Sequence, residues 1–160
     1  MTAIAVTGHM DLSEGTVPQV REAIRVLLRE HARGELVGVS CLARGADTVF
    51  AEAVVEAGGR LVAVVPSLDY REAEVTADHA AAFDRLAAAA EVVTMPYDVA
   101  DRQAYEAANA ELLKRAERLV AVWDGTPPSG KGGGTADVVE QARALGLPVD
   151  VVWPEGAERA

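Results

Sequence analysis

The stretch ELVGVSCLARGADTVFAEAVVEAGGRLVAVV, residues 35–65, contains the pattern that decides the fold. Two short valine-rich runs, Glu35–Val39 and Leu61–Val65, flank a longer segment that ends at Gly58 and Gly59. Short apolar runs rich in β-branched residues are typical of strands in a parallel sheet. Glycine tolerates the left-handed conformation that ends a helix. The stretch therefore predicts a strand, a crossover helix and a second, parallel strand.

The same alternation continues in both directions along the chain. Further strands are predicted at Ala3–Thr7, Val92–Met95, Leu119–Trp123 and Val149–Trp153. Apolar residues spaced by three and four predict amphipathic helices within Val17–Leu28, Tyr105–Ala116 and Val138–Leu145. This alternation predicts an α/β fold, a three-layer Rossmann-like domain. Its mostly parallel sheet has about six strands, with helices on both faces.

The segment Asp69–Glu91 has two interpretations that the sequence leaves open. It forms either one long helix or a loop followed by a shorter helix. Within it, Ala87–Ala90 is predicted to be a helix interior, because alanine has the highest helix propensity.

Length and composition limit the classes of protein that this chain can belong to. A chain of 160 residues is expected to form one domain over residues 1–160. With 50% hydrophobic but only 4% aromatic residues, the core must consist of small aliphatic side chains. The net charge of −10 disfavours binding to nucleic acid or to an anionic membrane, and single-stranded DNA binding with it. A local basic pocket for a small anion remains compatible with that charge.

The cysteine and histidine content argues against disulfides and metal sites. Cys41 is the single cysteine, so no internal disulfide is expected, and the first residues lack the features of a signal peptide. We therefore expect a cytoplasmic protein. His31 and His79 lack partners at metal-ligand spacing, so neither a metal site nor a cofactor is expected.

Four loops that follow predicted strands have unusual composition. In a parallel sheet, ligands bind in the crevice beyond the carboxyl ends of the strands, so these loops are expected to converge on one site. The loops are Gly8–Asp11, Ser40–Asp47, Pro66–Asp69 and Asp124–Thr135.

The last of these loops argues against two familiar nucleotide motifs. It lacks a P-loop because Gly132 follows Lys131 where a hydroxyl is required, and Pro127 and Pro128 each remove an amide donor. A dinucleotide-binding motif is also missing, since the first strand is followed by Gly8 alone.

The glycines that remain in this loop suggest a simpler anion site. Residues 132–135 form a Gly-Gly-Gly-Thr run into a helix, whose exposed amides and dipole attract a phosphate. The alternative is a surface connector in which Thr135 only caps the helix. Lys131 is either a phosphate contact or a solvated charge.

The segment Ser40–Asp47 resembles the Ser-x-Leu-Ala-Arg-Gly-x-Asp stretch of the DNA-processing protein A family. Together with Thr7-Gly8-His9, Trp123-Asp124-Gly125 and the late Gly-Gly-Gly-Thr run, it makes the chain similar to the SLOG superfamily. That superfamily joins this fold to the Lonely Guy phosphoribohydrolases and to YpsA-like proteins, and actinobacterial YpsA-like members are the most similar. The resemblance implies a Rossmann-like fold and a nucleotide or nucleotide-derived ligand. It also implies a homodimer or higher homo-oligomer.

The resemblance also implies roles for single residues. Arg44 and Gly45 would face a phosphate, with Asp47 in the first helical turn. A guanidinium suits bidentate phosphate contact, although Arg44 is equally a candidate for a surface ion pair and Asp47 for a residue that only favours the helix N-terminus. His9 either contacts the ligand or is a loop residue, and Trp123 either stacks on a base or packs in the core.

The residues of the predicted ligand site follow from these loops and from the resemblance. They are Gly8, His9, Ser40, Arg44, Gly45, Asp47, Pro66, Trp123, Asp124, Lys131, Gly132, Gly133, Gly134 and Thr135.

The sequence leaves open whether the protein is an enzyme. Lonely Guy enzymes carry Pro-Gly-Gly-x-Gly-Thr-x-x-Glu in the late loop, and this chain has Val138 in place of the glutamate that serves hydrolysis. Cleavage of an N-glycosidic bond needs a carboxylate beside the developing positive charge. The main hypothesis is therefore nucleotide binding. The alternative is a nucleoside-monophosphate N-glycosidase that uses an atypical carboxylate, with Asp124, Asp137 and Glu140 as candidates.

Overall fold

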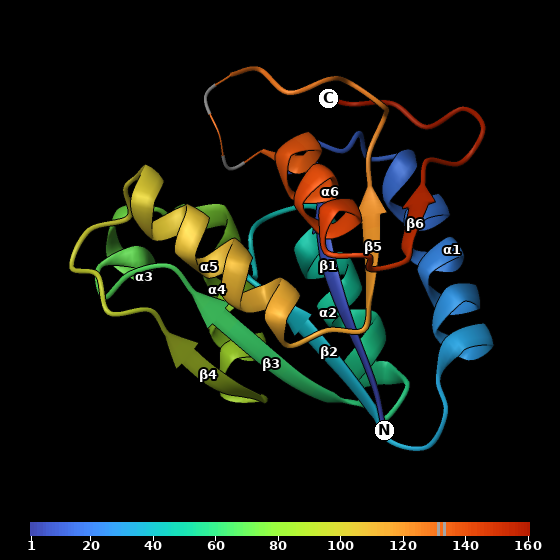
Figure 1. Cartoon of the computed structure of the whole chain (residues 1–160), viewed down its shortest axis with the longest axis horizontal. Coiled ribbons are helices and arrows are strands. Elements are labelled where there is room, and N and C mark those ends of the chain that lie inside the picture. The colour runs from blue at the N-terminus through green and yellow to red at the C-terminus, as the bar shows by residue number, and fades with distance from the viewer. Residues whose placement is uncertain (131, 133) are drawn as a thin grey trace.

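The computed structural model describes residues 1–130, 132 and 134–160, and within them six strands form one parallel sheet. The sheet order is β4-β3-β2-β1-β5-β6, and each neighbouring pair is parallel (Figure 1). The strands are β1 (Thr2–Gly8), β2 (Leu36–Ser40), β3 (Arg60–Val65), β4 (Ala90–Thr94), β5 (Arg118–Val122) and β6 (Val149–Val152).

Helices cover both faces of this sheet, which gives three layers (Figure 1). They are α1 (Thr16–His31), α2 (Ala46–Glu56), α3 (Tyr70–Ala73), α4 (Ala77–Ala88), α5 (Arg102–Lys114) and α6 (Thr135–Ala144). Helices α1 and α2 pack against Ile4 and Val6 of β1, whereas α5 and α6 pack over Ala3 and Ala5. Side chains alternate between the two faces of a strand, so β1 contributes to both cores. The predicted Rossmann-like α/β fold is confirmed.

The region between β3 and β4 differs from its sequence prediction. It contains the single turn α3 and then α4, which is close to the second interpretation of Asp69–Glu91, a loop and a shorter helix. The prediction that Ala87–Ala90 is a helix interior is wrong at its end, because α4 ends at Ala88 and Ala90 begins β4. Ala90 pairs with Leu61 of β3, so strand pairing overrides the helix propensity of alanine here.

The carboxyl ends of β1, β2 and β5 lie side by side because these strands are neighbours in the sheet. The loops after β1 and β5 and the start of α2 therefore meet at the centre of one edge. Among the described residues, no helix is both long and apolar enough to cross a bilayer.

Candidate functional site

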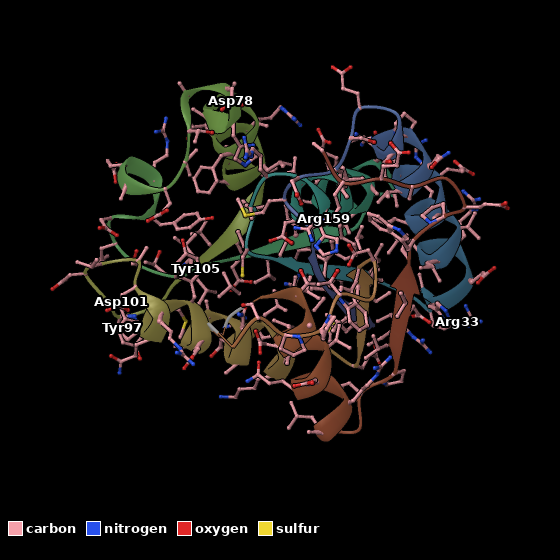
Figure 2. All side chains as sticks on the ribbon, turned by 90° about the horizontal axis from the view of Figure 1, so that it is seen from above. Arg33, Asp78, Tyr97, Asp101, Tyr105 and Arg159 are labelled. Atoms are coloured by element: carbon pink, nitrogen blue, oxygen red, sulfur yellow. The ribbon has the colours of Figure 1, made fainter. Side chains whose placement is uncertain are left out.

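A cavity of about 460 Å³ lies at this edge of the sheet. Its walls come from the residues after β1, β2 and β5, from the start of α6, and from α3, α5 and the C-terminal segment. Figure 2 looks onto this edge and shows Arg159 near the centre of the view, with Tyr105 of α5 to its left. Both side chains line the cavity.

Gly8 holds the central part of the site together. A Cβ at this position would lie 2.5 Å from Cβ of Ala46 and 2.7 Å from Cβ of Val122, so only glycine lets β1, β5 and α2 approach this closely. Backbone hydrogen bonds connect the same elements. The N–H of His9 donates to the Val122 carbonyl at 3.0 Å, and the N–H of Ala46 donates to the His9 carbonyl at 3.1 Å.

The loop after β2 is shaped by buried polar contacts. The Ser40 hydroxyl, which is completely buried, donates to the Asp47 carbonyl at 3.1 Å and accepts from the Leu42 N–H at 3.1 Å. Gly45 has φ 77° and ψ −125°, and a Cβ there would lie 2.6 Å from the His9 carbonyl oxygen. Neither Ser40 nor Gly45 lines the cavity, and the contacts of both shape the loop.

Asp47 does line the cavity and is 8% exposed. Its Oδ2 accepts a hydrogen bond from the Ala43 N–H at 3.3 Å. Burial raises the pKa of the Asp47 carboxyl to about 7, although the Ala43 amide acts in the opposite direction. Burial, with the Asp47 charge as a smaller cause, also raises the pKa of Cys41 and of Tyr70, both of which line the same cavity.

His9 and Asp124 form a second polar cluster. His9 is 7% exposed and lines the cavity, with its Nε2 3.1 Å from Oδ1 of Asp124 and 3.1 Å from the backbone nitrogen of Asp124. Hydrogen bonds from the Thr126 hydroxyl and amide, at 2.6 and 2.9 Å, lower the pKa of Asp124 to about 2. Asp124 does not itself line the cavity. It is a fixed anion at neutral pH, which does not suit a general acid.

Trp123 lines the cavity beside this cluster. Its indole N–H donates to the Thr126 carbonyl at 2.9 Å, which leaves the half-buried ring beside the open loop after β5. The placement fits the stacking interpretation of Trp123 better than the core interpretation.

The first turn of α6 contributes Gly134, Thr135 and Asp137 to the cavity. The Asp137 carboxylate accepts a hydrogen bond from the Gly134 N–H at 3.1 Å. Val138, at the motif position of the Lonely Guy glutamate, is 1% exposed and belongs to the core beneath α6. Glu140 is exposed and does not line the cavity. Of the three candidate carboxylates, Asp137 is therefore the one in the cavity wall.

The cation in the cavity wall is not the arginine that the sequence suggests. Arg44 is 48% exposed, does not line the cavity, and lies 3.7 Å from the carboxylate of Asp78. Figure 2 shows Asp78 at the periphery of the molecule, far from Arg159. Among the described lysines and arginines, Arg159 is the one that lines the cavity.

Arg159 is placed by contacts with the opposite end of the chain. Its Nε donates to the two carboxylate oxygens of Asp11 at 2.9 and 3.1 Å, and its Nη1 lies 3.7 Å from Asp124. Residues Leu12 and Arg159 also form an antiparallel bridge. No local signal in the sequence identifies Arg159, because the contact joins residues 148 positions apart.

The remaining predicted residues take other positions. Pro66 is buried and does not line the cavity. The loop that contains it is held to the segment after β4, because the Asp69 carboxylate accepts a hydrogen bond from the Ala100 N–H at 3.0 Å. Gly132 lies against the Arg102 side chain. Lys131 and Gly133 lie outside the described residues. The described part of the chain contains no cluster of His, Cys, Asp or Glu suited to a metal ion.

Besides Arg159, the sequence also missed residues of the wall that come from α3 and α5. Tyr70 lies on α3, and Tyr105 and Asn109 lie on α5. The spacing of Tyr105 indicates a helix face that packs on the sheet, and the structure places this face partly over the cavity.

No protein-family model matches the chain, and no curated protein matches it. Solved structures do match. DNA processing protein A from Streptococcus pneumoniae has a TM-score of 0.71 at 20% identity, over 98% of this chain and 52% of its own. DNA processing protein A from Helicobacter pylori has a TM-score of 0.69 at 15% identity, over 99% of this chain and 68% of its own. The Moco carrier protein from Chlamydomonas reinhardtii has a TM-score of 0.53 at 20% identity, over 94% and 74%.

These similarities concern the fold. The chain spans about half the length of the Streptococcus protein. The Helicobacter structure is described as binding single-stranded DNA, and the Chlamydomonas protein as a carrier of Moco. DNA processing protein A, whose family the Ser40–Asp47 segment resembles, thus shares its fold with nearly the whole of this chain. The chain has the Rossmann-like fold that the SLOG resemblance predicts.

Proposed function

We propose that the chain binds a nucleotide or nucleotide-derived phosphate compound in the cavity at the carboxyl ends of its strands. The observation that carries the proposal is that one cavity of about 460 Å³ joins a helix N-terminus, an arginine and three aromatic rings. A volume of this size is typical of small-molecule sites. Aromatic rings can stack on a base, and the helix N-terminus and the arginine can bind a phosphate.

The phosphate end of the cavity is formed by α6 and Arg159. The first backbone N–H groups of a helix have no partner within the helix, and the helix dipole favours an anion there. Thr135 and Ala136 line the cavity in this first turn. The Arg159 guanidinium pairs with Asp11 across the cavity wall and offers further N–H donors.

The charge distribution favours a small ligand over a nucleic acid strand. The chain has a net charge of −10, and Asp11 and Asp137 line the cavity together with Arg159. A polyanion is repelled by such a surface, whereas one phosphate is held by a helix N-terminus and a single guanidinium. We therefore propose a small phosphate compound as the ligand in preference to single-stranded DNA.

A second candidate function is hydrolysis of the N-glycosidic bond of a nucleoside monophosphate. It is favoured by one observation, the presence of the Asp137 carboxylate in the wall beside the start of α6. The buried Val138 at the motif position argues against it. Binding without hydrolysis remains the first proposal.

A thermal-shift experiment tests the binding proposal. We expect AMP, CMP, GMP, UMP or ribose 5-phosphate at millimolar excess to raise the melting temperature, because a ligand that binds only the folded state stabilises it by about 2.7 kcal/mol at a hundredfold excess over Kd. The matching nucleosides, which lack the phosphate, serve as controls. If no phosphate compound raises the melting temperature, the proposal is wrong.

We also expect a cytoplasmic protein that forms a homodimer or higher homo-oligomer. The oligomer rests on the SLOG resemblance and on the alanine-rich sequence of α4, because small side chains let another helix pack closely. Light scattering tests it. A particle of 16.8 kDa at every accessible concentration would contradict the oligomer.

A further inference from the structure

The cavity has a second end that the phosphate proposal does not use. Asp47 and Tyr70 belong to elements that follow β2 and β3, whereas Trp123 and Thr135 follow β5. Strand β1 lies between these two groups in the sheet. The wall on the β2 side is completed by Tyr105 and Asn109 of α5.

Two buried side chains at this second end have polar atoms without partners. Asp47 is 8% exposed and Tyr70 is 6% exposed, and both line the cavity. Among the described residues, the Asp47 carboxyl accepts one hydrogen bond, from Ala43 to Oδ2, and the Tyr70 hydroxyl makes none. In the part of the chain that the structure describes, no side-chain nitrogen or oxygen that is fully shielded from solvent lacks a hydrogen-bond partner, so the unpaired Asp47 Oδ1 and Tyr70 hydroxyl reach the open space of the cavity. Both groups are therefore suited to contact a ligand.

We propose, on the basis of the nucleotide-binding function above, that Asp47 recognises the base of the ligand. Its carboxyl pairs with an amidine edge, the ring nitrogen and the adjacent amino group that adenine and cytosine share. The Tyr70 hydroxyl supplies a further hydrogen bond at the same end. Asp47 and Tyr70 are therefore specificity-determining residues, and the ligand is a phosphate ester of an amino-substituted base.

The surroundings of Asp47 favour its protonated form. Asp47 has no ion-pair partner in the described part of the chain, and an unpaired buried charge is costly. Arg44, three residues earlier, pairs with Asp78 instead. The titratable groups on the elements around Asp47 are Cys41 after β2, Tyr70 on α3, His79 on α4, Tyr105 on α5 and His9 after β1.

A protonated carboxyl matches the amidine edge in both groups. It offers one O–H donor for the ring nitrogen and one oxygen that accepts from the amino group. The oxo bases of IMP and UMP present the acceptor and the donor in the reverse order. The Ala43 N–H bonds to Oδ2 and so favours the proton on Oδ1, while the phosphate at the start of α6 sets which way the base faces, so the carboxyl does not match the reversed order. An ionised carboxylate has no donor, so it cannot satisfy the ring nitrogen of adenine or cytosine. Burial raises the pKa of Asp47 to about 7, which brings this change into the range of an ordinary titration experiment.

Calorimetric titration with matched nucleotides tests the inference. The pairs AMP and IMP, and CMP and UMP, differ only by an amino group in place of an oxo group. At pH 6.0 we expect the amino member of each pair to bind about tenfold more tightly. Between pH 6.0 and 8.5 the affinity for AMP is expected to fall about thirtyfold relative to ribose 5-phosphate, as the protonated fraction of Asp47 decreases. Ribose 5-phosphate corrects for titration of the phosphate itself.

Two variants separate the role of the carboxyl from its proton. Asp47→Asn offers a donor and an acceptor at every pH, so it should keep the preference for AMP over IMP and lose the pH dependence. Tyr70→Phe should weaken AMP about tenfold and leave ribose 5-phosphate unchanged, because it removes only the hydroxyl. Melting temperatures of both variants establish that they fold.

The outcomes distinguish this inference from the function on which it rests. If ribose 5-phosphate binds but AMP and IMP bind equally, the base recognition by Asp47 is wrong and the phosphate site stands. The same holds if Asp47→Asn retains the full pH dependence of AMP binding. If neither ribose 5-phosphate nor any nucleotide binds, the proposed function and this inference are both overturned.

Discussion

The two loops that form opposite walls of the cavity are built in different ways. In the loop after β2, residues 41–45, Leu42 is completely buried and its carbonyl lies 3.0 Å from Nε2 of His79. The Thr48 hydroxyl also bonds back to Ala43 at 2.7 Å. In the loop after β5, by contrast, residues 125–130 are exposed, and the contact of Trp123 with Thr126 stays within the loop.

This difference suggests that the two walls have different roles in binding: the wall after β2 is called the first wall, and the wall after β5 the second wall. Buried hydrogen bonds hold the wall after β2 in one arrangement, so that it can present Asp47 at a fixed position. The wall after β5 is anchored at Asp124 by His9 and Arg159, but its residues 125–130 are exposed, which is typical of a segment that can adapt to a ligand. Specificity is therefore expected from the first wall, and contact with the phosphate from the start of α6.

The largest expected effect comes from adding a side chain to the first wall. Gly45→Val should lower the free energy of unfolding by about 4 kcal/mol or more. Its φ of 77° and ψ of −125° disfavour any side chain, and the new Cβ would meet the carbonyl oxygens of His9 at 2.6 Å and Met10 at 2.7 Å. Urea denaturation measures the loss.

The matched control lies in the second wall. Gly125 also has a positive φ, 89°, but a Cβ there would have no atom within 4 Å. Gly125→Ala should therefore cost only about 1 kcal/mol, the strain of the backbone alone. If both variants lost the same free energy of unfolding, the loop after β2 would accommodate a new side chain as easily as the loop after β5.

The second effect concerns the pH dependence of stability. The pKa of Asp47 is raised to about 7, so between about pH 4 and pH 7 the folded state holds a proton that the unfolded state has released. The stabilisation by this neutral carboxyl is complete below about pH 4, and it is lost as the pH rises to about 7.

The comparison of the wild type with Asp47→Asn isolates this effect, because the other titrating groups are common to both proteins. From pH 5 to pH 8 the wild type should lose about 2 to 3 kcal/mol of unfolding free energy relative to the variant. Denaturation curves at several pH values measure the difference. A constant difference across this range would show that Asp47 titrates normally.

The sequence predicts the architecture well because the sheet is encoded by local patterns. Runs such as Leu61–Val65 are apolar throughout, since both faces of a central parallel strand are covered by helices. The prediction fails at Ala87–Ala90, where helix propensity and strand pairing compete. Local propensity cannot resolve that competition, since the partner strand β3 is separated from Ala90 by more than twenty residues.

For the site, the sequence finds positions where the backbone itself imposes a requirement. Gly8 and Gly45 are recognisable because close approach or a positive φ demands glycine. Arg44 and Arg159 show the limit of this reasoning. The fork of either guanidinium suits a phosphate, but which arginine reaches the cavity depends on a tertiary contact of the C-terminal segment with Asp11.

The third prediction uses these two arginines. Arg159→Ala should weaken binding of ribose 5-phosphate about tenfold, because it removes the guanidinium from the cavity wall. Its exposed ion pair with Asp11 contributes little to stability, so the fold should remain intact. Arg44→Ala is the control and should change the affinity less than twofold. The reverse order of effects, measured by calorimetric titration, would place the anion near α4 instead.

The smallest expected effect is on base release, and it decides between the binding module and the hydrolase. Incubation of the wild type with AMP or CMP should release little or no free base by chromatography. The motif position holds the buried Val138, and the Asp124 carboxylate is engaged by Thr126 and His9. Hydrolysis needs a carboxylate that stabilises positive charge and activates water, and Asp137 is engaged with the Gly134 amide. Rapid release of free base would favour the hydrolase over the binding module. If Asp137→Asn then lost this activity and Glu140→Gln, outside the cavity wall, kept it, Asp137 would be the carboxylate responsible.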